Sequence, residues 1–398
     1  VLDRFDRRIV YVKPGFFVIR DDLSAPQPHA YNFLLHSDGM GEIVPSGDLF
    51  TVVRGRSQMW ARVISSAALT PHIESYPGAE DYGPYLRLET TRTAKATFTA
   101  CLCPQPCANP KLLQNGGFEK GMAGWTPRSN EDLPNHTFAT DNPAEGKQYA
   151  RIAQSGYFYS ARFGLPVGST VTARVKIRTE GTPEEKGATM HLYFWKSGTA
   201  FANVAAGPFR GEQWTEQTIS GKVPEGTEEV SLALEYFAPG AGCFDDVRIE
   251  TDAPVVNGLV PLIKPLGSDG LDITLGAERT VVLCGAAGQV SEAAGLKTDA
   301  VLGVVALDAQ GQPARAFLQG GTYVSWQGKL LLGLARPGTA EAALAGGKLA
   351  AQVTYDVTPH APWPAQAELR TTWQPTAATL NGQAGRVKTA GALRTVSN

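Results

Sequence analysis

The chain has 398 residues, with 36 Lys and Arg against 38 Asp and Glu, so its formal net charge is −2. This length is enough for two or three hydrophobic cores, and the near-neutral charge excludes broad electrostatic binding to DNA or RNA. No apolar run approaches the ~18 residues of a membrane span. Gly (43) and Pro (27) are abundant, which is typical of short strands joined by tight turns. The first residue is Val1, so we expect a mature or trimmed fragment.

Residues 1–104 consist of strand-like runs. Ile9–Val12 and Phe16–Arg20 are separated by a Lys-Pro-Gly turn, and further runs follow at regular spacing. None shows the period of a helix. Residues 105–111, QPCANPK, have the composition of a linker.

Residues 111–251 have the length of one domain. The segment opens with NGGFEKGMAGW (115–125) and closes with FDDV (244–247), and alternating strands lie between them. Two inner faces packed together predict a β-sandwich.

Residues 252–398 begin with a second linker and return to short strands, with predicted hairpin tips at Asp308–Gly311 and Gln327–Gly328. We infer an all-β protein in which 1–110 and 252–398 form one discontinuous antiparallel β-sandwich. Residues 111–251 would be inserted in one of its loops, where insertion is tolerated. The competing interpretation is three domains in a row.

The five cysteines offer no obvious metal site. Cys101, Cys103 and Cys107 cluster in CLCPQPC, whereas Cys243 and Cys284 stand alone, and no fourth ligand lies near the cluster. One disulfide within the cluster is an alternative in an oxidising compartment. We expect buried thiols.

The run RRIVYVKPGFFVIRDDL (7–23) followed by HAYNFLLH (29–36) resembles the start of the C-terminal β-sandwich of heparinase II/III-like polysaccharide lyases. The resemblance covers residues 4–104 and, more weakly, 259–335. In those enzymes catalysis lies mainly in an α/α-toroid domain before the sandwich, and this chain has no long helical pattern. The resemblance therefore implies a catalytically incomplete part of a secreted bacterial lyase. It also implies a uronate-containing polysaccharide as ligand and the missing toroid as partner.

Several such lyases hold zinc in the sandwich with an Asp and two His. The resemblance places Asp21, or alternatively Asp22, and His36 in such a site, but residues 1–28 contain no His to complete it. Carboxylate and imidazole are ordinary zinc ligands. The alternative is that the two Asp cap a turn and His36 is hydrogen-bonded at a strand end.

Three further residues of this region are candidates to face the toroid. A lyase needs a base, an acid and groups that neutralise a carboxylate, and the relatives use Tyr, His, Asn and Arg. His29, Tyr31 and Arg54 are the candidate contributors here. The alternative is ordinary strand-surface chemistry.

The opening and closing motifs of residues 111–251 resemble those of jelly-roll carbohydrate-binding modules, in which a Glu and a closing Asp hold a structural calcium. The resemblance names Glu119 and Asp246 as side-chain ligands, with backbone oxygens near Gly117 and Lys147. Hard oxygen ligands suit calcium. The alternative is a solvated acidic edge.

Alternation along two strands of the same segment predicts an exposed aromatic platform. In TMHLYFWKS and EVSLALEYF, one set of side chains suits a core, and the other leaves Tyr193, Trp195 and Glu235 on a concave face with Tyr157 or Tyr159 in reach. Sugar rings stack on such aromatic side chains. The resemblance to carbohydrate-binding modules implies that Trp125 and Trp214 are core residues. The alternative is that the platform packs under a loop or against the host sandwich.

These expectations combine into a noncatalytic C-terminal portion of a secreted polysaccharide lyase, with a supporting β-sandwich and a carbohydrate-binding module. The rival interpretation is a stand-alone glycan-binding or adhesion protein. No paired carboxylates predict a complete glycosidase.

Overall fold

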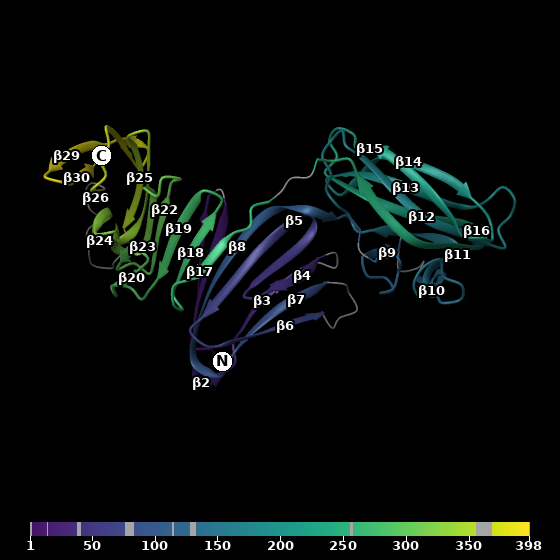
Figure 1. The fold of residues 1–398 in the computed structure, drawn as a ribbon, viewed down its shortest axis with the longest axis horizontal. Coiled ribbons are helices and arrows are strands. Elements are labelled where there is room, and N and C mark those ends of the chain that lie inside the picture. Colours follow the sequence, from purple (N-terminus) through teal and green to yellow (C-terminus); the bar gives the residue numbers. More distant parts are fainter. Residues whose placement is uncertain are drawn as a thin grey trace.

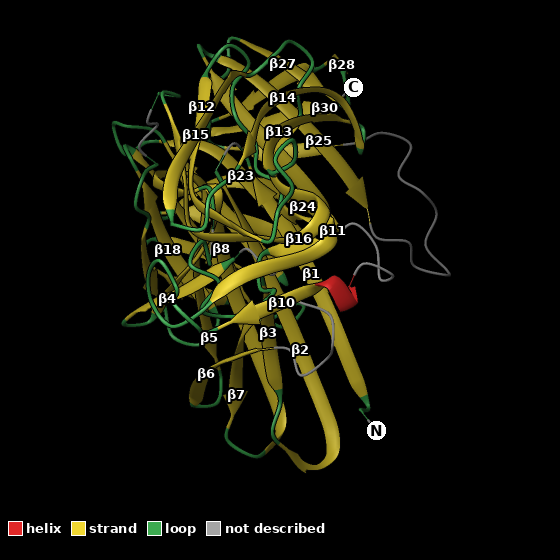
Figure 2. Ribbon diagram, turned by 90° about the vertical axis from the view of Figure 1, so that its right-hand side faces the viewer, coloured by secondary structure: helices red, strands yellow, loops and turns green. Residues whose placement is uncertain are grey.

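The computed structural model describes residues 2–13, 15–37, 41–75, 83–113, 115–127, 133–254, 258–355 and 368–397. These residues form almost entirely antiparallel sheets, with one short 3-10 helix (Figure 2), so the all-β fold expected from the sequence is confirmed. No helix within the described ranges is long and apolar enough to cross a membrane. Three units lie in a row, and the N-terminal one is in the middle (Figure 1).

The N-terminal unit is a small sandwich of a five-stranded sheet, β1-β2-β8-β5-β4, and a three-stranded sheet, β3-β7-β6. The strands are β1 (Arg4–Val12), β2 (Phe16–His29), β3 (Asn32–His36), β4 (Glu42–Ser46), β5 (Leu49–Ser65), β6 (Leu69–Ser75), β7 (Pro84–Thr90) and β8 (Thr93–Lys111). Phe33, Leu86 and Phe98 are buried between the sheets. The predicted turn before Phe16 is present, because Gly15 N donates to Val12 O at 2.9 Å.

Residues 105–111 are not a linker, contrary to the prediction from composition. They belong to β8, which pairs with β5 as far as Gly55 opposite Lys111. β2 pairs with β8 only up to Leu102, so the last part of β8 has a strand on one side only. Prolines are tolerated in such an edge segment because no ladder hydrogen bond is lost there, and Pro104 and Pro106 occupy it.

Residues 111–251, which we call the module, form a separate sandwich. Its elements are β9 (Trp125–Pro127), the 3-10 helix η1 (Leu133–Asn135), β10 (His136–Ala139), β11 (Tyr149–Ser160), β12 (Thr170–Glu180), β13 (Ala188–Lys196), β14 (Thr199–Phe209), β15 (Thr215–Lys222) and β16 (Glu229–Thr251). The first half of β16 pairs with β13 and the end of β11, and its second half pairs with β12 and the start of β11. One long strand therefore contributes to both layers.

The two tryptophans assigned to the module core differ. Trp125 is 5% exposed and packs on Phe118 in the core cluster, which confirms its assignment. Trp214 is only partly buried and lies outside that cluster. Its ring contacts Tyr149, and its Nε1 donates to Asn142 O at 2.9 Å. The assignment of Trp214 to the core was wrong, because a position just before β15 lies at the rim, beyond the covered inner face.

The C-terminal unit is built on one large twisted sheet whose main path runs β17-β18-β19-β22-β23-β24-β25-β27-β28. Its strands are β17 (Leu262–Pro265), β18 (Gly270–Leu275), β19 (Glu278–Cys284), β20 (Ser291–Ala293), β21 (Leu296–Thr298), β22 (Leu302–Leu307), β23 (Pro313–Trp326), β24 (Lys329–Ala345), β25 (Lys348–Tyr355), β26 (Glu368–Thr371), β27 (Ala377–Leu380), β28 (Gln383–Ala384), β29 (Arg386–Ala390) and β30 (Leu393–Ser397). Gln327 and Gly328 have φ of 48° and 78°, as a two-residue hairpin turn requires, and Gly311 N donates to Asp308 O at 2.9 Å. Both predicted hairpin tips are confirmed.

The N-terminal and C-terminal units share an apolar layer. Val18 and Cys101 from the five-stranded sheet are buried against Ile273, Val282 and Val304 from the C-terminal sheet. No described strand of one unit pairs with a strand of the other. The two units therefore share an apolar layer but not a sheet. That they form one discontinuous domain stays a prediction, which excision of the module would test.

The two connections to the module lie side by side. Leu259 N donates to Gln105 Oε1 at 3.0 Å, and Arg56 Nη2 donates to Pro254 O at 2.9 Å. The chain therefore leaves and re-enters the neighbourhood of β5 and β8 at nearly the same place, as insertion into a loop requires.

All five cysteines are buried free thiols, as expected. Burial raises the pKa of Cys284, in the apolar layer between units, to about 12. Burial likewise raises the pKa of Cys243, in the module, to about 12. These thiols stay protonated at neutral pH, so they act as apolar side chains.

Candidate functional site

One side of the module gathers aromatic side chains from three adjacent strands. β16 lies between β11 and β13, so Glu235 is opposite Tyr157 on one flank, and Ser231 is opposite Tyr193 on the other. Because side chains alternate along a strand, the groups that avoid the core project to one side. We call this set the aromatic face: Tyr157, Tyr159, His191, Tyr193, Trp195, Ser231, Glu235 and Phe237.

The same alternation fills the core beneath the face. Met190, Leu192 and Phe194 of β13 are at most 2% exposed, whereas His191, Tyr193 and Trp195 are partly exposed. The prediction of which side of β13 enters the core is therefore confirmed.

The rings of the aromatic face touch in a continuous series. Tyr159 stands edge-on to Tyr157, Tyr193 and Trp195, with ring centroids 4.7, 5.6 and 5.9 Å apart. His191 is stacked on Tyr193 at 5.5 Å. Edge-to-face and stacked pairs of this kind are favourable beyond the area they bury, so the rings support one another in fixed positions.

Two groups of β16 fix the rings of β13 from below. Tyr193 OH donates to Glu235 Oε1 at 3.2 Å, and Trp195 Nε1 donates to Ser231 Oγ at 2.9 Å. Burial, together with the charge of Glu235, raises the pKa of Tyr193 to about 12, so the phenol stays neutral. The face is thus a rigid, largely apolar surface with a buried carboxylate beneath it.

The Trp195 end of the face meets a pocket between the module and the N-terminal unit. The guanidinium of Arg162 lies 3.7 Å over the Trp195 ring and covers one side of it. Beyond it, a pocket of about 480 Å³ is lined by Tyr159, Glu229 and, from β5, Arg54. Trp195 is therefore neither fully open nor buried against the host sandwich.

The structure gives different partners to Glu119 and Asp246, the two carboxylates predicted to hold calcium. Glu119 Oε1 accepts from Lys147 N at 2.7 Å, and Asp245 Oδ2 accepts from Ala144 N at 2.8 Å, so both carboxylates hold the loop that precedes β11. Asp246 instead pairs with Arg248 at 2.8 Å.

A β-bulge explains why the two aspartates differ. The register between β12 and β16 shifts beside Asp246, which has a φ of 47°, so the simple alternation is broken there. Lys176 lies 3.4 Å from Asp246 as a second cation. The Asp246 charge therefore has two basic partners, and the calcium site at Glu119 and Asp246 stays a prediction. Gly117 remains a candidate only through its backbone oxygen.

The residues predicted for a zinc site are not brought together. Asp21 is 2% exposed and accepts two hydrogen bonds from Arg7, each 2.7 Å long. His36 lies on a strand of the other sheet and stacks on Tyr85 at 5.1 Å. Within the described parts of the chain, no group of three or more His, Cys, Asp or Glu side chains is placed to hold a metal.

The three candidate contributors to a lyase site also separate. Tyr31 is 5% exposed, and its OH donates to Ala94 O at 3.1 Å, so it is a core residue and does not face a partner domain. His29 is exposed at the end of β2. Arg54 faces the pocket beside the module. They do not form one surface.

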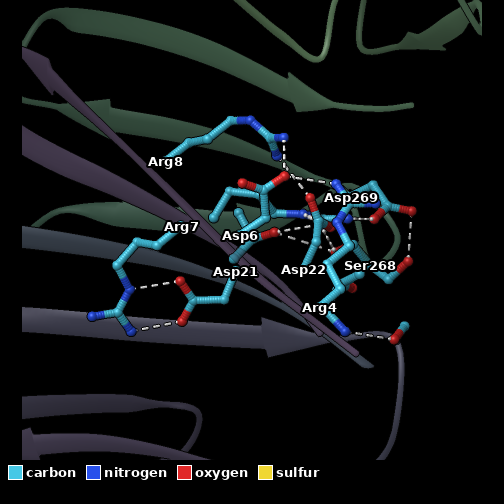
Figure 3. Close-up of polar contacts among 12 residues, drawn as sticks. Arg4, Asp6, Arg7, Arg8, Asp21, Asp22, Ser268 and Asp269 are labelled. Atoms are coloured by element: carbon cyan, nitrogen blue, oxygen red, sulfur yellow. Dashed lines mark hydrogen bonds and ion pairs between the residues drawn. The ribbon is translucent and has the colours of Figure 1, made fainter. Parts of the chain in front are cut away.

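An arginine–aspartate network that the sequence did not predict joins β1, β2 and the C-terminal unit (Figure 3). Arg20, 7% exposed, binds Asp22 at 3.0 Å and Asp269 at 2.7 Å. Arg8 binds Asp22 and Asp6, each at 2.7 Å. Asp269 comes from the turn between β17 and β18, so the network bridges units far apart in the sequence.

Sequence reasoning also missed Arg162, because it lies in the loop after β11 and has no strand alternation to place it. Ser231 and Phe237 lie on the predicted side of β16, but nothing in the sequence singled out a serine or an end residue.

The fold and the aromatic face define a β-sandwich module carried on a second, larger β structure. A comparison with protein-family models finds no match, and a comparison with curated proteins finds none either. Among solved structures, the carbohydrate-binding module TmCBM61 in complex with β-1,4-galactotriose is 19% identical, with a TM-score of 0.28, and the alignment covers 36% of this chain and 100% of that one.

Two other solved structures are similar over the same share of the chain. A family 16 carbohydrate-binding module is 15% identical, with a TM-score of 0.29, covering 35% of this chain and 99% of that one. The enzymatically active domain of tailspike protein 4 from bacteriophage CBA120 is 12% identical, with a TM-score of 0.29, covering 35% of this chain and 21% of that one. TM-scores this low carry no conclusion about function, which has to come from the site.

Proposed function

We propose that this chain is a glycan-binding protein and that the aromatic face of the module is its binding surface. The observation that carries the proposal is the continuous series of rings Tyr157, Tyr159, Tyr193 and Trp195, held in place by Glu235 and Ser231. Sugar rings have flat C–H faces that pack on aromatic rings. Their hydroxyls pair with polar groups such as the partly exposed imidazole of His191.

The arrangement fits binding better than catalysis. Glu235 is the carboxylate in the middle of the face, and it already contacts Tyr193 OH at 3.2 Å and His191 Nε2 at 3.5 Å. Glycoside hydrolysis uses two carboxyl groups on opposite sides of the bond. A rigid ring surface, in contrast, binds at low entropic cost because its side chains are ordered before the ligand arrives.

The test is glycan-array screening followed by calorimetry on the full chain. Trp195→Ala and Tyr193→Ala should each weaken binding of the best ligand by more than about tenfold, or ~1.4 kcal/mol. Tyr11→Ala is the matched control, because Tyr11 is an exposed tyrosine of the N-terminal unit that stacks on Phe17. An array without any ligand, or equal losses in all three variants, would overturn the proposal.

The larger context that we propose is a secreted bacterial polysaccharide lyase acting on uronate-containing glycans, with the catalytic toroid outside residues 1–398. The support for this context is the resemblance of residues 7–23 and 29–36 to the β-sandwich of heparinase II/III-like lyases. Tyr31 is buried and Asp21 is paired with Arg7, so neither residue adds support. The alternative is a stand-alone glycan-binding or adhesion protein. Sequencing the full gene product separates them: a helical toroid upstream of Val1 supports the lyase, and a leader peptide directly upstream supports the alternative.

A further inference from the structure

The two ends of the aromatic face differ, because one is exposed and the other continues into a pocket. At the exposed end, Phe237 is 45% exposed, and its ring centroid lies 6.2 Å from that of Tyr157. At the other end, Tyr159 and Trp195 both line the pocket of about 480 Å³, a volume within the range of ordinary small-ligand sites. A glycan that lies along β11 and β13 would therefore meet a pocket at one end only.

The N-terminal unit stands behind this pocket. Arg54 of β5 lines it, as does Arg162 in the loop after β11. The backbone of β5 also comes close to that loop, since a methyl group added to Gly55 would lie 4.0 Å from Cβ of Phe163. β5 thus occupies the direction in which a glycan chain would have to continue beyond the Trp195 end of the face.

The pocket contains polar groups that suit the hydroxyls of a sugar. The guanidinium of Arg162 lies 3.7 Å over the Trp195 ring and 3.4 Å from the Glu229 carboxylate. Arg162 and Glu229 are both partly exposed. A guanidinium has five N–H donors and a carboxylate has several acceptor positions, so this single contact leaves both groups able to bind hydroxyls beside an aromatic ring.

The end of a glycan chain differs chemically from its interior. A terminal sugar carries a hydroxyl where an internal sugar carries the bond to the next unit. In a partly enclosed pocket, hydrogen bonds to that hydroxyl are less screened by water than they are on an open surface. An internal sugar in the same position would have to direct its next unit toward β5. The shape and the chemistry of the pocket both favour a chain end.

We propose that this pocket binds the terminal sugar of a glycan chain, so that the protein recognises chain ends and not the interior of a polysaccharide. The inference rests on the proposed function of the aromatic face, whose rings would bind the sugars that follow the terminal one. It gives the N-terminal unit a part in specificity, because that unit stops the chain at the pocket.

The first experiment counts the copies of the full chain that bind to one glycan molecule. The best linear glycan of the array is titrated by calorimetry, both as a short oligosaccharide and as its long polymer. Recognition of a chain end predicts one bound protein per glycan molecule at either length. A number that rises with chain length overturns this inference and leaves the glycan-binding function standing. Absence of binding to every glycan overturns both.

Thr126→Trp tests the location of the terminal sugar. Thr126 is an exposed residue of β9 that lies opposite Tyr159 and lines the pocket, so an indole at this position fills the pocket and leaves the rings of the face in place. Binding of the short oligosaccharide should weaken by at least about tenfold. Thr137→Trp is the matched control, because Thr137 is an exposed residue of β10 that lies opposite Arg151, outside the pocket.

The control variant should bind like wild type, and urea unfolding checks that both tryptophan variants fold. Glu229→Ala removes an acceptor from the pocket and should weaken binding roughly fivefold, so it decides the question if Thr126→Trp does not fold. Wild-type affinity in a folded Thr126→Trp, or equal losses in both tryptophan variants, overturns the placement of the chain end in this pocket.

Discussion

Replacing Arg20 by methionine should destabilise the junction between the N-terminal and C-terminal units. The guanidinium is 7% exposed and contacts Asp22, Asp269 and Thr99 at 3.0, 2.7 and 2.8 Å. Burial opposes its charge, but the carboxylates of Asp269 and Asp22 outweigh burial, so the pKa of Arg20 is raised. Arg20 is therefore charged at every working pH, and Arg20→Met removes one side of a buried ionic network.

The magnitude follows from the exposure of the partners. Removing one member of a fully buried ion pair costs about 3–5 kcal/mol. Here the side chains of Asp22 and Asp269 are 20% and 51% exposed to solvent. Water therefore solvates both carboxylates partly once the guanidinium is removed. Methionine retains much of the apolar stem. We expect a loss of about 2–3 kcal/mol, a roughly 30- to 150-fold shift in the unfolding equilibrium.

The assay is urea unfolding of the full chain combined with amide hydrogen exchange. Arg20→Met should lower the first unfolding midpoint and speed exchange in β17 and β18, which pack on the five-stranded sheet. Exchange in the module core should not change, which provides an internal control. Asp269→Asn should cost about 1 kcal/mol or less, because that carboxylate is half exposed. Unchanged midpoints and exchange in Arg20→Met would refute the role assigned to the network.

Four further outcomes are expected. Calcium should raise the melting temperature of the chain by mass action, and Glu119→Ala should abolish the rise; equal melting with calcium and with chelator argues against the ion. Replacing the module by a short Gly/Ser linker should leave a soluble, cooperative β protein, whereas stable folding of 259–398 without 1–110 would contradict the shared domain. Trp125→Ala should cost about 3–5 kcal/mol and Trp214→Ala distinctly less, as measured by unfolding; the reverse order would contradict the burial argument. Absorbance assays for unsaturated uronate on heparin, chondroitin and alginate should stay flat with this chain, and clear turnover would show that a catalytic site is complete without the toroid.

The sequence alone determined the features that depend on neighbours along the chain. Alternation in β13 assigned Met190, Leu192 and Phe194 to the core and Tyr193 and Trp195 to the opposite side, because adjacent residues of a strand project to opposite sides of a sheet. The Gln327–Gly328 tip followed from the positive φ that a tight hairpin requires. The prediction of a linker at 105–111 was wrong, because a proline-rich composition also fits an edge segment of a strand.

Only the tertiary structure decided which distant groups meet. It brought Arg54 to Trp195 and Arg162, and it paired Arg20 with Asp269, 249 positions further along the chain. It also set Asp245, and not Asp246, on the loop held by Glu119, since a bulge interrupts the alternation there. Strand order, bulges and contacts between units depend on pairings between residues far apart in the sequence. A local period of two fixes which side of a strand a residue faces, and it contains no information about what lies opposite that side.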